Sequence, residues 1–109
     1  MKNIKVIDVI KSEFAVSPED GDSLYVIIEQ EIESYRKVSI DFDGIEIMTT
    51  AFLNNAIGKL YKNFDKSVLN EYIIMKNISE SDIILLKKAI DRAKITFNKD
   101  MIEELEEEF

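Results

Sequence analysis

Short segments with the apolar pattern of a strand alternate along the chain with segments that have the pattern of a helix. Residues 2–11 are rich in isoleucine and valine, and residues 38–42 alternate strictly between apolar and polar side chains, so both are predicted to be strands. Residues 71–76 form a third short, apolar and β-prone segment. Residues 95–97 are predicted to form a short strand or an extended connection.

Amphipathic helices are predicted after these strands, each at a capping signal. The first helix is expected to begin either with Ser17 as its cap and Pro18 at its first position, or, because of Gly21, nearer Asp22. Its apolar stripe is Leu24, Ile27, Ile28, Ile32 and Tyr35. The second helix follows Thr49 and Thr50, and its apolar face is Phe52, Leu53, Ala56, Ile57, Leu60 and Phe64. The third follows a capping box that begins at Ser79, and its stripe is Ile83, Leu86, Ile90 and Ala93. A last, acidic helix is predicted over residues 99–109.

This order of strands and helices predicts an α/β fold with right-handed crossovers. The sheet is expected to be mostly parallel or mixed and to have about four strands. Because residues 38–42 alternate, one face of the sheet is expected to be wet and the helices to cover only the other, which makes a two-layer sandwich. With one proline and no linker-like stretch, residues 1–109 are predicted to be a single domain, with a core over about 1–95.

The composition removes the parts of most enzyme mechanisms. The 109 residues contain no cysteine and no histidine, so thiol nucleophiles, Ser-His-Asp triads and thiolate or imidazole metal sites are excluded. The three glycines, Gly21, Gly44 and Gly58, are too far apart for a phosphate-binding glycine motif. We therefore expect a protein that is not an enzyme and that uses no cofactor and no metal.

The net charge of −8 predicts repulsion from nucleic acid and from anionic membrane surfaces. No apolar run approaches the roughly 20 residues that span a bilayer. The N-terminal residues 1–5 lead into a short alternating stretch rather than into the apolar core of a signal peptide. We expect a cytoplasmic protein whose partner is another protein.

Residues 38–60 carry the most distinctive motif, VSIDFDGIEIMTTAFLNNAIGKL. They contain Ser39-Ile40-Asp41-Phe42-Asp43-Gly44-Ile45 and then Thr49-Thr50-Ala51-Phe52. This pattern resembles the strand, turn and helix of STAS domains, the fold of bacterial anti-sigma-factor antagonists. It is most similar to a STAS-like family of unknown function, and the likeness covers about residues 1–95.

The resemblance implies a regulatory module that binds a protein partner such as a kinase-like ATPase or an anti-sigma-type regulator. In the antagonists, a serine or threonine at this helix start is phosphorylated. The resemblance places Thr50 at that acceptor position and Thr49 where the family has an aspartate, while Phe52 stands where a small glycine is usual. The partner surface implied in this way comprises Asp43, Gly44, Met48, Thr49, Thr50, Phe52, Asn54 and Asn55.

The residues themselves leave several alternatives open. Thr49 and Thr50 can be helix caps only, and Phe52 can be either a core anchor or a partly exposed contact. Asp41, Asp43 and Glu46 suggest a magnesium site, against solvated strand and turn acids. The acidic segment 100–109 suggests a solvated face, a docking helix, or an acidic inhibitor or decoy that blocks a basic partner surface. Lys59, Lys62 and Lys66 are expected to form a solvated face.

Overall fold

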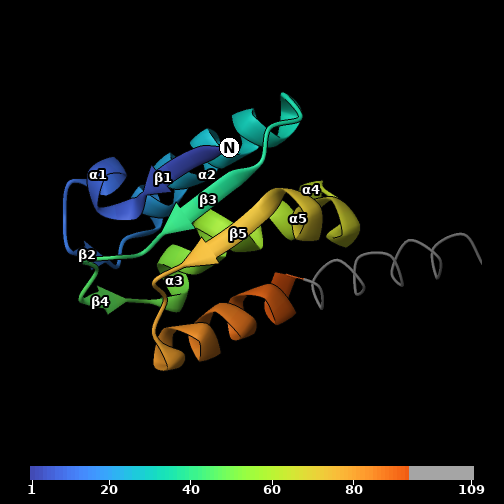
Figure 1. Ribbon diagram of the computed structural model, residues 1–109. Coiled ribbons are helices and arrows are strands. Elements are labelled where there is room, and N and C mark those ends of the chain that lie inside the picture. The colour runs from blue at the N-terminus through green and yellow to red at the C-terminus, as the bar shows by residue number, and fades with distance from the viewer. Residues whose placement is uncertain (94–109) are drawn as a thin grey trace, which may run out of the picture.

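The computed structural model describes residues 1–93, which form two separate parallel sheets (Figure 1). The larger sheet has the order β1-β3-β5, with β1 at Lys2–Lys5, β3 at Val38–Asp41 and β5 at Ile73–Lys76. The smaller sheet pairs β2 (Phe14–Ala15) with β4 (Ile47–Met48). The α/β class with parallel sheets is confirmed, but the single sheet of about four strands is wrong. Within residues 1–93 the strands divide into three plus two, because β2 and β4 pair there only with each other.

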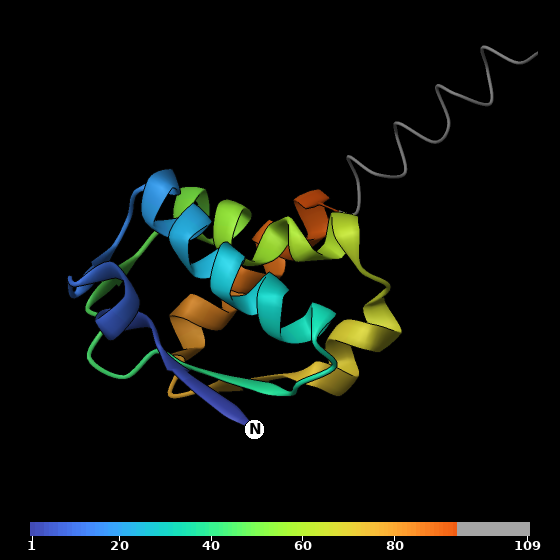
Figure 2. The same ribbon diagram turned by 90° about the horizontal axis from the view of Figure 1, so that it is seen from above.

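The helices gather on one side of the larger sheet, as the view from above shows (Figure 2). The first two are α1 (Val6–Ile10) and α2 (Pro18–Glu33). A second helical run then comprises α3 (Thr50–Leu53), the π-helical segment η1 (Asn54–Gly58) and α4 (Leu60–Asn63). It is followed by α5 (Lys66–Tyr72) and by a last helix that occupies residues 80–93 of the described part.

Two predicted boundaries are wrong, because a short apolar run fits the residue spacing of a strand as well as that of a helix. The predicted strand over residues 2–11 ends at Lys5, and the chain continues as α1, whose Val6 is fully buried. Lys11 then closes α1 in a left-handed conformation, with φ of 59°. The predicted strand at residues 71–76 begins only at Ile73, because Leu69 is buried at helical spacing in α5.

The predicted start of α2 is confirmed. Ser17 is the N-cap, its hydroxyl accepts a hydrogen bond from the Asp20 backbone N–H at 3.1 Å, and Pro18 is the first helical residue. The buried side chains of the helix, all within the predicted stripe, are Leu24, Ile28 and Ile32. The predicted member Tyr35 is wrong, because it follows the helix end with φ of 58° and is 82% exposed.

The predicted apolar face of the second helical run forms the centre of the core. Its fully buried members are Phe52, Leu53, Ala56, Ile57 and Leu60. The last helix also begins as predicted, since the Asp82 backbone N–H donates to the Ser79 hydroxyl at 3.2 Å, and it buries Leu86, Ala89 and Ala93. The predicted segments 95–97 and 99–109 lie outside the described residues.

The face of the larger sheet opposite the helices carries two cross-strand rows of mostly exposed side chains. One row is Asn3, Ser39 and Ile74, and the other is Lys5, Asp41 and Lys76. The fully wet face predicted for β3 is wrong at Ser39, which is only 1% exposed. Ser39 lies on the central strand between Asn3 and Ile74, so its neighbours in register shield it from water.

None of the helices within residues 1–93 combines the length and the apolar content that crossing a membrane requires.

Candidate functional site

Thr49 fixes the junction at which β4 enters α3 (Figure 1). Its hydroxyl accepts a hydrogen bond from the Phe52 backbone N–H at 3.2 Å, which makes it the N-cap of the helix. The same hydroxyl donates to the Val16 carbonyl at 2.9 Å, and the Thr49 backbone N–H donates to the Ala15 carbonyl at 3.1 Å. Thr49 therefore ties the end of β2 to the helix start, and its hydroxyl is used twice within the fold.

Thr50 differs from its neighbour because its hydroxyl makes no hydrogen bond within the part of the chain that the structure describes. It is the first residue of α3 and is only half-buried. The positive end of the helical backbone dipoles lies at this position. Of the two threonines, Thr50 is therefore the one whose hydroxyl the described part of the fold does not use.

Three exposed apolar side chains lie beside this helix start. Phe14 is 42% exposed, Val16 is 40% exposed and Ile47 is 52% exposed. Phe14 and Ile47 are partners in the β2-β4 register, and the Val16 carbonyl is bound by Thr49. Their strand neighbours Ala15 and Met48 point the other way and are buried. We call Phe14, Val16 and Ile47 the β2-β4 patch.

Two residues of the predicted partner surface are wrong because they belong to the core. Phe52 is fully buried and Met48 is 6% exposed, so neither side chain can meet a partner. For Phe52 this decides between the two roles that the sequence left open. The Phe52 side chain fills the interior beneath the helix start.

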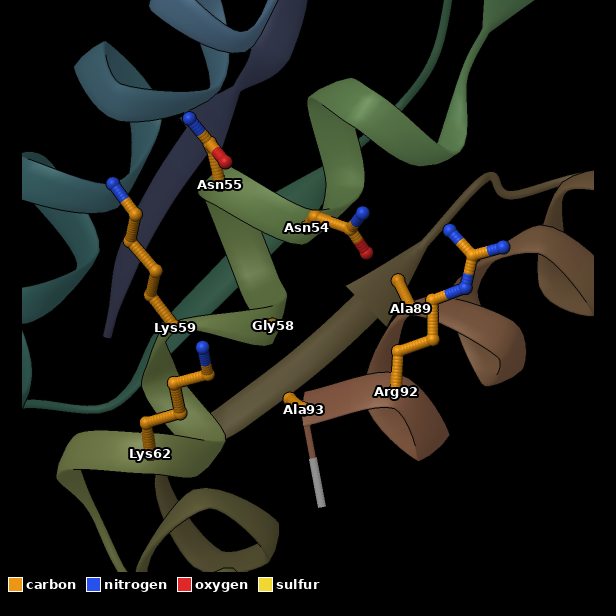
Figure 3. A pocket seen from close by; sticks show the side chains of 8 residues that line it. All are labelled: Asn54, Asn55, Gly58, Lys59, Lys62, Ala89, Arg92 and Ala93. Carbon is orange, nitrogen blue, oxygen red and sulfur yellow. The ribbon is translucent and has the colours of Figure 1, made fainter. Parts of the chain in front are cut away.

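The two asparagines of the predicted surface point to different places. The Asn55 amide donates to the Pro18 carbonyl at 3.3 Å and to the Asp22 carboxylate at 3.1 Å, so it joins the second helical run to the start of α2. Asn54 instead lines a separate hollow beside the last helix (Figure 3). Asn54 lies one helical turn after Thr50, and its backbone N–H donates to the Thr50 carbonyl.

Asp43 and Gly44 form an exposed turn, as predicted, at the end of β3. The Asp41 carboxylate accepts hydrogen bonds from the Asn77 amide and from the Asp43 backbone N–H, both at 2.9 Å. These two bonds, Asn77 first, hold the pKa of Asp41 below its ordinary value, and nearby Lys5 and Lys76 act in the same direction. Asp41 thus fastens the two turns that follow β3 and β5.

The magnesium interpretation of Asp41, Asp43 and Glu46 is not supported by this geometry. Within residues 1–93 there is no group of three acidic side chains placed to hold a metal ion. One of the two Asp41 carboxylate oxygens, Oδ1, already accepts hydrogen bonds from both neighbouring turns.

The β2-β4 patch was missed by sequence reasoning. Its signal was weak, because Phe14-Ala15-Val16 is a run of three apolar residues, too short to define a strand. The alternation of Ile47 and Met48 does predict that one of them faces outward, but which one depends on the pairing with β2.

A family model described as a STAS-like domain of unknown function matches residues 20–82. The matched part extends from the first turn of α2 through β3, the β4-α3 junction and β5 to the first turn of the last helix. No curated protein and no solved structure matches the chain.

Proposed function

Because the chain belongs to the family of STAS-like domains of unknown function, we propose that it is a regulatory module that works by binding another protein and catalyses no reaction itself. The surface that supports this best is the β2-β4 patch together with Thr50. The observation that carries the proposal is that three exposed apolar side chains lie on or next to β2 and β4, which adjoin the helix start whose Thr50 hydroxyl makes no hydrogen bond within residues 1–93.

The patch supplies affinity for a protein surface of complementary shape. Exposed apolar side chains that cluster rather than scatter are typical of interaction sites. Burying apolar surface stabilises a complex by about 25 cal/mol for each Å² removed from water. The net charge of −8 disfavours anionic ligands over most of the molecule, so a protein with an apolar contact region is the partner class that we propose.

Thr50 supplies the means of switching that affinity. Phosphorylation would add about −1.5 to −2 charges at neutral pH. The start of α3 tolerates negative charge because of its dipole, so the free domain would keep its fold. An apolar interface at the β2-β4 patch would instead have to desolvate the phosphate, so the partner would be released. The family resemblance favours a kinase-like ATPase or an anti-sigma-type regulator as that partner.

The proposal is tested by capture from an extract of the native host on three immobilised proteins. They are the wild type, Ile47→Glu in the patch, and Val26→Glu, whose parent side chain is 49% exposed on α2. A protein retained by the wild type and by Val26→Glu but not by Ile47→Glu supports the surface. Equal retention by all three refutes it. Mass spectrometry of the native protein shows whether Thr50 or Thr49 carries phosphate.

A further inference from the structure

A second surface feature is a hollow between the C-terminal end of α2 and α5, which lie beside each other in Figure 2. Its volume is about 490 Å³, within the roughly 300–1,000 Å³ of pockets that hold small molecules. Three aromatic side chains line it: Tyr35 beyond the end of α2, Phe64 at the end of α4 and Tyr72 in the last turn of α5. Ile32 and Val68 add aliphatic surface to its wall. We call this feature the aromatic hollow.

Two carboxylates also line the aromatic hollow. Glu33 is the last residue of α2 and Glu71 lies in the last turn of α5, and both residues are exposed. Neither carboxylate makes a hydrogen bond or an ion pair within residues 1–93, whereas Glu31, in the turn before, is paired with Arg36 at 3.3 Å. The negative end of the α2 dipole lies at Glu33 as well, and the last turn of α2 contains no basic residue. The hollow therefore combines aromatic surface with negative charge that these ion pairs leave unbalanced.

Tyr35 occupies a backbone position that favours glycine. Its φ is 58°, in the left-handed region, and it closes the end of α2. The Tyr35 N–H donates to the Ile32 carbonyl at 3.0 Å, and the N–H of the next residue donates to the Glu31 carbonyl at 2.9 Å. These two bonds define a Schellman motif, whose left-handed residue is usually glycine because a side chain is strained there.

The Tyr35 side chain gains little from the fold in return for this strain, because it is 82% exposed. Strained residues persist where the surrounding structure or a function requires them, and they cluster at ligand sites. An exposed aromatic ring, held in a strained conformation at the edge of an aromatic hollow, is better explained by contact with a ligand than by packing.

We propose that the aromatic hollow binds a small quaternary ammonium compound, with Tyr35, Phe64 and Tyr72 in contact with its methyl groups. Aromatic rings attract cations through their π-electrons, and a group of rings is a general means of holding a cation that has no N–H to donate. Glu33 and Glu71 balance the charge of the ligand. The net charge of −8 favours cations over anions at the same place. This site shares no residue with Thr50 or the β2-β4 patch, and the inference does not depend on the proposed protein-binding function.

The test is a titration of the full 109-residue chain with choline at constant ionic strength, followed by heteronuclear NMR spectra. Neohexyl alcohol, in which carbon replaces the nitrogen of choline, has the same shape without the charge, and sodium ions have the charge without the methyl groups. We expect saturable shifts centred on residues 32–35 and 64–72 with choline, about tenfold weaker binding of neohexyl alcohol, and no saturable shifts with sodium. Choline shifts that never saturate, or equal binding of the uncharged alcohol, would overturn the proposal.

Two variants and one matched control complete the test. Tyr35→Gly removes one ring and relieves the left-handed strain, so it should weaken choline binding by about fivefold without lowering the midpoint of urea unfolding. Glu71→Gln removes one charge from the hollow and should weaken binding by about threefold. Glu19→Gln removes the same charge from an exposed position at the opposite end of α2 and should leave binding unchanged. Wild-type affinity in Tyr35→Gly, or equal losses in Glu71→Gln and Glu19→Gln, would show that the aromatic hollow is not the site.

Discussion

Gly21 lies where α2 crosses the start of the second helical run, and its replacement by alanine tests the packing that positions Thr50. A Cβ atom at Gly21 would lie 2.5 Å from the Phe52 carbonyl oxygen, 3.0 Å from the Asn55 Cβ and 3.1 Å from the Ala56 backbone nitrogen. Two of these three atoms belong to backbone, so the clash can be relieved only by moving one helix away from the other.

The expected change in the free energy of unfolding of Gly21→Ala follows from two opposing effects. Replacing glycine by alanine inside a helix ordinarily stabilises it by about 1 kcal/mol. Overfilling a packed contact costs about 1–3 kcal/mol, and the 2.5 Å approach to a carbonyl oxygen belongs at the upper end. We therefore expect Gly21→Ala to lower the free energy of unfolding by about 1–2 kcal/mol, opposite in sign to helix propensity alone.

Gly58→Ala is the matched control, because Gly58 also lies where two helical segments pack against each other. Its added Cβ would lie 3.5 Å from the Ala89 carbonyl oxygen and 3.8 Å from the Ala93 Cβ, which is ordinary van der Waals contact. Gly58→Ala should therefore be neutral or stabilise the protein by up to about 1 kcal/mol. Both free energies are measured by urea unfolding. A Gly21→Ala protein as stable as the wild type would refute the close approach of α2 to α3.

Four further substitutions test particular contacts. Thr49→Val removes the helix cap and should destabilise the protein by about 1–2 kcal/mol in the same urea assay. Thr50→Val should change the stability by less than about 0.5 kcal/mol. Equal effects of the two substitutions would contradict the different roles of the two hydroxyls. Phe52→Ala should cost about 3–5 kcal/mol in thermal or urea unfolding, and a cost near zero would contradict its burial. Asp41→Ala should flatten the acid limb of a stability–pH curve. Because the native pKa of Asp41 is lowered, its contribution is complete above the unfolded value of about 4 and is lost as the pH falls through the native pKa. An unchanged acid limb would rule this contribution out.

The parts of the fold that sequence reasoning identified are those in which several local signals agree. Ser17 and Pro18 mark a helix start before a regular apolar stripe, and α2 begins there. The apolar face beginning at Phe52 keeps helical spacing for several turns, and its buried members form the core. Such long periodic segments can bury one face in only one way, so the sequence specifies them.

The remaining differences arise where tertiary pairing decides between nearly equal local choices. Residues 6–10 have apolar side chains that suit a strand or one turn of helix, and the chain adopts the helix α1. Ser39 occupies an outward-facing position in the alternating pattern of β3, yet its neighbours on β1 and β5 bury it.

In the candidate site, too, some features could be predicted from the sequence and others could not. The helix start at Thr49 was predictable from the residues, because a hydroxyl before an apolar helical stripe is a capping signal. The exposure of Phe14 and Ile47 was not, because it depends on a two-residue pairing between segments more than thirty residues apart. The depth of Phe52 likewise depends on how α2 and the last helix pack against the second helical run.

The central claim is that this protein binds its partner at the Thr50 end of the molecule, and one comparison of captured proteins tests it most directly. Thr50→Glu places a negative charge at the helix start, and Ser67→Glu places the same charge at an exposed position on α5. The account predicts that the partner retained by the wild type is retained by Ser67→Glu and by a chain lacking residues 100–109, but is lost by Thr50→Glu. The account would be contradicted if Thr50→Glu retained the partner and deletion of residues 100–109 lost it. Together with binding that weakens steeply with salt, that result would indicate an acidic decoy instead.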